Sequence, residues 1–212
     1  SAQRTAAWTD VARRIAHEIK NPLTPIQLSA ERLKRKYAGE ITSDPEIFQQ
    51  CTDTIVRQVG DIGRMVDEFS SFARMPAPVM KRENALELLS QAVFLQRVAH
   101  PDITFSTEAP KEPVWFEGDG RLIAQALTNV LKNAGEGIAA RLAKGDDAPG
   151  RIVAALERAT NGKDGGASLV YRIADNGVGL PPEHRHRLTE PYVTTRAKGT
   201  GLGLAIVRKI ME

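Results

Sequence analysis

The sequence has few aromatic residues and almost no cysteine. Aromatic residues make up 5% of its 212 residues, so aliphatic side chains must supply most of the packing, which favours helix-rich structure. Cys51 is the only cysteine, which excludes a disulfide within the chain and a CxxC metal site and fits a reducing cytoplasm. No apolar run approaches the ~18 residues that span a bilayer, and no signal peptide opens the chain.

A strong charge of one sign is also missing. The 29 basic and 26 acidic residues leave a net charge of +3, and although the isoelectric point is about 9.1, the two signs are interspersed. No Lys/Arg run is interleaved with aromatic residues, as a nucleic-acid-binding groove would need. We therefore expect a mixed, solvated surface and no nucleic-acid partner. Because a helical pattern is already under way at Ser1, a membrane anchor before that residue stays open.

The first third of the sequence predicts a helical hairpin. Residues recur in alternating steps of four and three, the heptad spacing of packed helices, at Ile15, Ile19, Pro22, Ile26, Ser29 and Leu33 and again at Ile55, Val59, Ile62, Val66, Phe69 and Ala73. Between these runs, Gly39 is a stop signal and Ser43 or Asp44 can cap a helix that begins at Pro45. Two narrow seams cannot close a core alone, but two hairpins can form a four-helix bundle. We predict a homodimer through residues 9–73; a hairpin packed on the rest of its own chain is the alternative.

The remainder of the sequence mixes helices and strands. The prolines of 75–78 push the residues before them out of the helical region, which predicts a linker between domains 1–74 and 79–212. Strands are expected at 79–83, 103–107, 114–117, 151–157 and 168–174, with a polar turn at 161–166. Helices are expected from Asn84 to about Ala99, from Asp119 to about Ala143, and from about Gly201. This pattern predicts a separate α+β domain after the all-helical one.

Four segments can carry chemistry, and each has an ordinary structural alternative. His17 lies off the apolar seam and faces solvent, where a neutral imidazole can be a nucleophile. Glu18 beside it can accept a proton from one ring nitrogen, although neighbours on a helix diverge by about 100°. Asn129 and Asn133 share one face of the long helix, and amide oxygens suit Mg²⁺. A solvated histidine and two solvated amides are the alternatives.

The other two segments are rich in glycine. Asp175-Asn176-Gly177-Val178-Gly179 follows a predicted strand, where a carboxylate can accept a hydrogen bond from an exocyclic amine; the same residues also suit an ordinary turn. Residues 199–204, Gly-Thr-Gly-Leu-Gly-Leu, open a helix whose N-terminus favours a phosphate. This segment matches neither a Walker A motif nor a Rossmann fingerprint.

Taken together and in this order, the four segments resemble the H box, N box and two glycine boxes of the sensor histidine kinases. The resemblance spans His17 to Gly203, and residues 188–196 look like the nitrogen-regulation branch, most like NtrY-type kinases. It implies a dimerisation and histidine-phosphotransfer bundle followed by an α/β-sandwich ATP-binding domain of the gyrase, Hsp90 and histidine kinase type. The implied function is ATP-dependent autophosphorylation and phosphoryl transfer to an aspartate of a response regulator.

The resemblance also implies roles for individual residues. His17 is the expected phosphoacceptor, Glu18 its general base, and Asn21 the residue that positions a water for dephosphorylating the regulator. Asn133 is expected to hold Mg²⁺ with Asn129 beside it, and Asp175 to read the adenine amino group. Residues 181–198 are expected to form a lid over ATP. The expected nucleotide-binding residues are Asn129, Asn133, Asp175, Gly177, Gly179, Thr194, Thr195, Arg196, Lys198, Gly199, Thr200, Gly201, Leu202 and Gly203.

The sequence departs from the family pattern in two respects. Many members carry a basic residue three positions after the N-box asparagine, where this chain has Glu136, so Lys132, Arg196 or Lys198 must supply the cation. The family normally adds a strand pair after the second glycine box, so we expect the ATP-binding domain to be truncated at its C-terminus. The resemblance also implies that the chain is the cytoplasmic portion of a membrane-anchored sensor kinase. A regulator-directed phosphatase, an ATP-sensing scaffold, or a chaperone or mismatch-repair ATPase of the same superfold are the alternatives.

Overall fold

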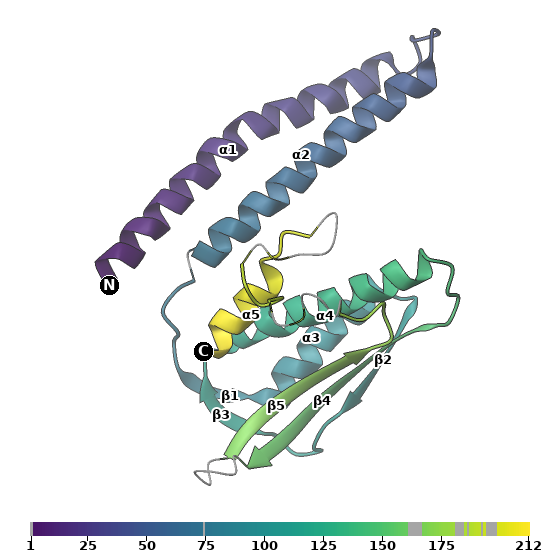
Figure 1. Cartoon of the computed structure of the whole chain (residues 1–212). Coiled ribbons are helices and arrows are strands. Elements are labelled where there is room, and N and C mark those ends of the chain that lie inside the picture. Colours follow the sequence, from purple (N-terminus) through teal and green to yellow (C-terminus); the bar gives the residue numbers. More distant parts are fainter. Residues whose placement is uncertain are drawn as a thin grey trace. The chain divides into compact units, whose positions relative to one another are not determined.

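The structure is a computed structural model of the chain and describes residues 2–73, 75–160, 167–180, 185, 187–191, 193 and 199–212. The chain forms two compact units (Figure 1). One contains Ser1–Pro76 with Arg196–Leu202, and the other contains Ala77–Thr195 with Gly203–Glu212. Within the described residues, no helix combines the length and the apolar character needed to cross a membrane.

The first unit contains a hairpin of two long helices, α1 (Ala2–Tyr37) and α2 (Pro45–Ala73). α2 begins with proline, which is tolerated in a first turn because its N–H would have no helical partner there. Asp44 precedes it with a positive φ of 52°, a conformation that short polar side chains tolerate. The N–H of Phe48 donates to the carbonyl of Asp44 at 3.2 Å and closes the first turn. The predicted hairpin is confirmed.

A line of mostly small residues packs the two helices together. The buried residues are Ala12, Ala16 and Ala30 of α1 and Thr52, Val59, Val66, Ser70 and Ala73 of α2. Four of those in α2 recur every seven residues, so they lie along one side of that helix. Ion pairs from Lys20 to Asp67 and from Lys34 to Asp53 join the helices at two levels. The interior of the hairpin therefore runs beside the predicted seam of α1 and not along it.

The larger members of the predicted seams remain partly exposed in the single hairpin. Their exposed fractions lie between 37% and 47% for Ile15, Ile19, Ile26, Leu33, Ile55 and Ile62. An apolar groove follows them, lined by Pro25, Ile26, Ser29, Ala30, Leu33 and Ile55. Of the predicted heptad residues, Val59, Val66 and Ala73 of α2 are thus buried in the hairpin, whereas the six larger ones leave an apolar stripe outside it.

The second unit mixes strands and helices. Its elements are β1 (Lys81–Asn84), α3 (Ala85–Ala99), β2 (Ile103–Glu108), β3 (Trp115–Gly118), α4 (Gly120–Leu142), β4 (Gly150–Thr160), β5 (Ala167–Asp175) and α5 (Gly203–Met211). Among the described strands, β2, β4 and β5 form one sheet in that order, with β2 parallel and β5 antiparallel to β4. β1 and β3 form a separate antiparallel ribbon.

Helices α3 and α4 pack on one face of the three-stranded sheet (Figure 1). β4 presents alternate residues to them, which is the two-residue period of a strand with one face buried. The fully buried members of this core include Leu89 of α3, Leu131 and Ile138 of α4, and Ile152 of β4. The predicted α/β sandwich after a helical hairpin is therefore confirmed.

Most element boundaries agree with the sequence prediction to within two or three residues. Asn84 caps α3 as expected, since its side-chain oxygen accepts the N–H of Leu86 at 3.2 Å. The strand predicted at 79–83 begins at Lys81, because its register is set by pairing of Lys81 with Gly118. The helix predicted from Gly201 begins two residues later. The predicted turn at 161–166 lies outside the described residues.

Candidate functional site

One face of α4 presents two amides and a glycine at intervals of one helical turn. Asn129, Asn133 and Gly137 are each four residues apart, which places them on the same side of the helix. The two asparagines are half-buried and the glycine is buried. The side of α4 that carries Leu131 and Ile138 faces the core and fixes the rotation of the helix. The two amides predicted to serve a nucleotide thus share one surface of a rigidly packed helix.

The first residue of α5 lies against these asparagines. The side-chain N–H of Asn129 donates to the carbonyl oxygen of Gly203 at 3.4 Å. A Cβ added to Gly203 would lie 3.9 Å from Nδ2 of Asn133. Just before α5, the N–H of Leu202 donates to the hydroxyl of Thr200 at 3.3 Å, and Gly201 has a positive φ of 69°. The structure therefore brings the N box beside the last glycine of the second glycine box.

The loop after β5 rests on the same face of α4. The N–H of Val178 donates to the carbonyl of Gly137 at 3.1 Å. A Cβ on Gly177 would lie 2.5 Å from the carbonyl carbon of Gly137 and 2.8 Å from the backbone nitrogen of Ile138. Real Cβ atoms do not approach backbone so closely, so only glycine at position 177 allows the loop to reach α4. A Cβ on Gly137 would itself lie in ordinary van der Waals contact with Asp175 Oδ1, at 3.6 Å.

Two side chains hold the same loop in shape. The exposed Asp175 accepts the N–H of Gly177 on its Oδ1 at 2.8 Å, which forms a tight turn. Asn176 bridges the loop to the start of β4, accepting the N–H of Arg151 and donating to the carbonyl of Pro149, both at 2.8 Å. The predicted adenine-reading carboxylate thus lies at the last residue of β5, directly before a loop that is fastened to both a strand and a helix.

The donors around this face fit a magnesium ion that arrives with phosphates. Within the described residues, no three His, Cys, Asp or Glu side chains gather into a cluster that could hold a metal. Mg²⁺ is commonly held by one or two protein oxygens together with substrate phosphates and waters. Amide oxygens at Asn129 and Asn133 meet that requirement. The charged pair next to them is loose, since Lys132 Nζ lies 3.9 Å from Glu136 Oε1 and both side chains are about half exposed.

The phosphoacceptor predicted from the sequence lies on α1. His17 is exposed, as expected, while Ala16 beside it is buried against α2. In the described contacts Glu18 is bonded to Arg14, whose Nε lies 3.0 Å from Glu18 Oε1, and not to His17. Both side chains of that pair are largely exposed, and such surface pairs contribute little and exchange readily. Asn21 is exposed one turn after His17.

Some predicted site residues fall outside the described structure. Thr194, Thr195, Arg196 and Lys198 are among them, as is most of the segment predicted to form a lid. The remaining residues predicted to bind nucleotide lie on α4, at the end of β5 and in the loop that follows it, and at or just before the start of α5.

Sequence reasoning missed two residues that shape the site. Gly137 continues the four-residue spacing of Asn129 and Asn133. A glycine inside a helix costs about 1 kcal/mol relative to alanine, so a glycine at this spacing could have indicated a close contact on the same face. Asn176 was read only as part of a turn. Its bridge to residues 149 and 151 depends on β4 running beside β5, which no local pattern reveals.

Comparisons with known proteins show what the two parts of the chain are similar to. The family model "His Kinase A (phospho-acceptor) domain" matches residues 7–78. The family model "Histidine kinase-, DNA gyrase B-, and HSP90-like ATPase" matches residues 118–212. The nitrogen regulation protein NtrY of Azorhizobium caulinodans is 63% identical over 213 residues, covering 100% of this chain and 26% of that protein. The sensory histidine kinase/phosphatase NtrB of Rhizobium meliloti is 31% identical over 214 residues, covering 96% of this chain and 52% of that protein.

A solved structure agrees over the whole chain. The histidine kinase ThkA, in a crystal structure with the response regulator protein TrrA, matches with a TM-score of 0.61 and 26% identity. The match covers 100% of this chain and 56% of that one. The chain spans 26% of the length of NtrY and 33% of a putative NtrY-like sensor histidine kinase of Rickettsia conorii.

Proposed function

This chain belongs to the sensor histidine kinases, and on that premise we propose that the protein transfers the γ-phosphoryl group of ATP to its own His17. The phosphoryl group then passes to an aspartate of a response regulator, in signalling related to nitrogen. The observation that carries the proposal is the single face of α4 on which Asn129, Asn133 and Gly137 meet both glycine segments, in a chain that also exposes a histidine beside a carboxylate on α1.

The transfer step follows from the chemistry of these groups. One ring nitrogen of neutral His17 attacks the γ-phosphorus, the bond from that phosphorus to the bridging oxygen breaks, and ADP leaves with the electron pair. The Glu18 carboxylate first gives up its ion pair with Arg14 and then takes the proton from the other ring nitrogen of His17. Because the transition state is loose, positioning and charge neutralisation supply most of the catalysis. Asn133, with Asn129 beside it, would hold a magnesium ion that neutralises phosphate charge, and Asp175 would orient the adenine.

We infer that two copies of the chain pair through the hairpin. The support is the apolar stripe of half-exposed residues along α1 and α2, together with the groove that contains Ile26 and Ile55. A second hairpin would cover this stripe and complete a four-helix bundle. The receiver domain of a response regulator is the proposed partner, since ThkA is a similar kinase that was solved in complex with one. The greater length of the relatives leaves room for the proposed membrane anchor.

One residue and one relative support a second activity, the removal of phosphate from the response regulator. Asn21 is exposed one turn after His17, where an amide can hold a water against a phosphorylated partner. The NtrB relative is described as a kinase/phosphatase. We therefore propose that the same helix face also removes phosphate from the regulator.

The test compares two histidine variants of the full-length protein. Incubation with ATP labelled on the γ-phosphate, in the presence of Mg²⁺, should label the wild type and not His17→Gln. His100→Gln is the matched control, because His100 is half-buried against α4 at Gly135 and has no proposed part in transfer. Both variants should bind ATP as the wild type does. Label retained in His17→Gln would remove the acceptor role from this residue.

A further inference from the structure

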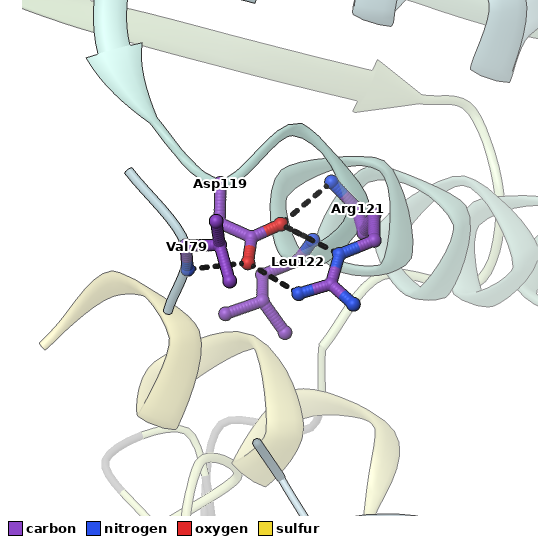
Figure 2. A network of polar contacts seen from close by, with 4 residues as sticks. All are labelled: Val79, Asp119, Arg121 and Leu122. Atoms are coloured by element: carbon purple, nitrogen blue, oxygen red, sulfur yellow. Dashed lines mark hydrogen bonds and ion pairs between the residues drawn. The ribbon is translucent and has the colours of Figure 1, made fainter. Parts of the chain in front are cut away.

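Asp119 uses both of its carboxylate oxygens at the beginning of α4 (Figure 2). Oδ1 accepts the backbone N–H groups of Arg121 at 3.0 Å and Leu122 at 3.4 Å, which is the ordinary work of a helix cap. Oδ2 accepts the backbone N–H of Val79 at 2.9 Å, forty residues earlier in the chain. The guanidinium of Arg121 contacts Oδ1 through Nε at 3.2 Å and Oδ2 through a terminal nitrogen at 2.8 Å. Asp119 itself is 5% exposed.

A helix cap alone does not need this arrangement. Serine, threonine or asparagine serves equally well as an N-cap, because one side-chain oxygen is enough. The second oxygen here is turned to an N–H outside the helix, and the arginine fork matches a carboxylate and not an amide. Capping therefore does not explain why a carboxylate stands at position 119. The hydrogen bond from Val79 to its second oxygen does explain it.

Val79 lies where the chain enters the second unit. Residues 75–80 have no regular structure, and β1 begins at Lys81, which pairs with Gly118 at the end of β3. Asp119 follows Gly118 directly, so its side-chain bond to Val79 extends the contact between these two segments beyond the last residue pair of the β1–β3 ribbon. A Cβ on Gly120 would lie 2.8 Å from the carboxyl carbon of Glu83, so this corner is closely packed. Residues 75–80, which extend the predicted linker by two residues, are thereby fastened near their end to the first turn of α4.

The same helix carries Asn129 and Asn133, the two asparagines proposed to serve the nucleotide. Asn129 lies ten residues after Asp119, which is about 15 Å along a helix axis. A packed helix of this length moves as one piece, so whatever holds its first turn also sets the direction in which Asn129 and Asn133 are presented. An unfastened linker would leave those residues in place within their own unit but would let the unit turn more freely on the chain that leads to His17.

We propose that Asp119 is a positioning residue that fastens the linker to the nucleotide-binding helix, so that the phosphoryl donor is presented to His17 in a restricted range of orientations. The proposal rests on the proposed kinase function. Transfer between two separately folded units depends on how often the donor and acceptor are aligned, and small misplacements reduce such rates by up to about 100-fold. Binding of nucleotide within the second unit does not depend on that alignment.

The test removes the donor of the bond without touching Asp119. Val79→Pro in the full-length protein deletes the backbone N–H, and Val79→Ala is the matched control because it keeps the N–H and loses only a half-exposed side chain. We expect Val79→Pro to lower the rate of autophosphorylation at saturating ATP about tenfold or more, with ATP affinity within about twofold of the control. Asp119→Asn keeps a capping oxygen but places an amide group against Val79 and Arg121. It should likewise lower the rate of autophosphorylation and leave ATP affinity nearly unchanged.

Two results would overturn the proposal. Equal rates in Val79→Pro and Val79→Ala would show that the bond does not affect transfer. A parallel loss of ATP affinity and rate would show that the bond merely supports the fold of the site. If the wild type is not labelled at all, the kinase function fails first. Amide hydrogen exchange then tests whether the bond from Val79 to Asp119 holds residues 75–80 in place. Faster exchange of residues 75–80 in Asp119→Asn than in the wild type, with exchange in α4 unchanged, would support the proposal. Equal exchange of residues 75–80 in the two proteins would reject it.

Discussion

The contact between Gly177 and α4 permits a prediction of definite size. Replacing Gly177 with alanine would put a Cβ 2.5 Å from the carbonyl carbon of Gly137, about 1 Å inside the 3.5–4.0 Å separation of carbon atoms in contact. Both sides of the clash are backbone, so no side-chain rotation can relieve it. The loop must move away by about that amount, which breaks the 2.8 Å hydrogen bond from the N–H of Gly177 to Oδ1 of Asp175 and releases that carboxylate from its orientation.

The displacement should cost both stability and affinity. Overpacking of this kind costs about 1–3 kcal/mol. Loss of a hydrogen bond to a charged group costs about 1.5–3 kcal/mol, so ATP affinity should fall about 10- to 100-fold if Asp175 holds the adenine. Calorimetric titration with a non-hydrolysable ATP analogue measures the second effect, and thermal unfolding measures the first.

Two control variants separate the clash from other effects of alanine. Gly145→Ala lies in the turn after α4, where φ is +88° and no atom lies within 4 Å of the added Cβ, so it should lower stability by about 1–2 kcal/mol and leave affinity unchanged. Gly137→Ala adds a Cβ in ordinary contact at 3.6 Å, so ATP affinity should change little, and stability should rise by up to about 1 kcal/mol because alanine replaces a glycine inside a helix. An affinity in Gly177→Ala within twofold of the wild type would refute the reasoning that this loop positions the nucleotide.

Three further predictions follow from the hairpin, the amide face and the helix cap. Ile26→Asp should convert a dimer to a monomer in light-scattering measurements, while Leu28→Asp, at a residue 60% exposed and off the seam, should leave the dimer intact; a dimeric Ile26→Asp would contradict the bundle. Asn133→Ala should abolish the part of ATP affinity that Mg²⁺ adds and keep the part measured in EDTA, so an unchanged Mg²⁺ increment would remove this residue from the metal site. Hydrogen bonds from the side chain of Arg121 and then from the backbone N–H of Val79 hold the pKa of Asp119 well below its usual range. The unfolded chain therefore binds this proton more tightly, and the stability that the carboxylate contributes is lost as the pH falls below about 4. Asp119→Asn should accordingly be less stable than the wild type at pH 7 in chemical denaturation, with a gap that narrows towards pH 3; a constant gap would count against the charged cap.

The sequence predicted the order and type of the elements because each is marked by local chemistry. Heptad spacing, prolines and capping residues are properties of neighbours in the chain. The cap at Asn84 lies where the pattern put it, and the helix predicted from Asp119 begins at Gly120 with Asp119 as its cap. Which residues of α1 pack within the hairpin was not predictable. Ala16 and Ala30 look like ordinary helix residues in sequence, and only the approach of α2 shows that they are buried.

The site was predicted as a set of motifs but not as an arrangement. The motifs indicated which residue types to expect, whereas the meeting of Gly177 with Gly137 and of Asn129 with Gly203 depends on contacts between distant segments. The start of β1 was misjudged by two residues for the same reason. Val79 and Met80 have the apolar character of a strand, but pairing begins at Lys81 because β3 ends at Gly118, and the N–H of Val79 goes to the side chain of Asp119.

The most direct test of the central claim is to identify the amino acid that receives phosphate. Full-length protein incubated with ATP labelled on the γ-phosphate and Mg²⁺ would be digested, and the labelled peptide located by mass spectrometry and tested for stability in acid and base. The account predicts an acid-labile, base-stable phosphoryl group on the peptide that contains His17. An acid-stable label, or a label on any other peptide, would contradict it.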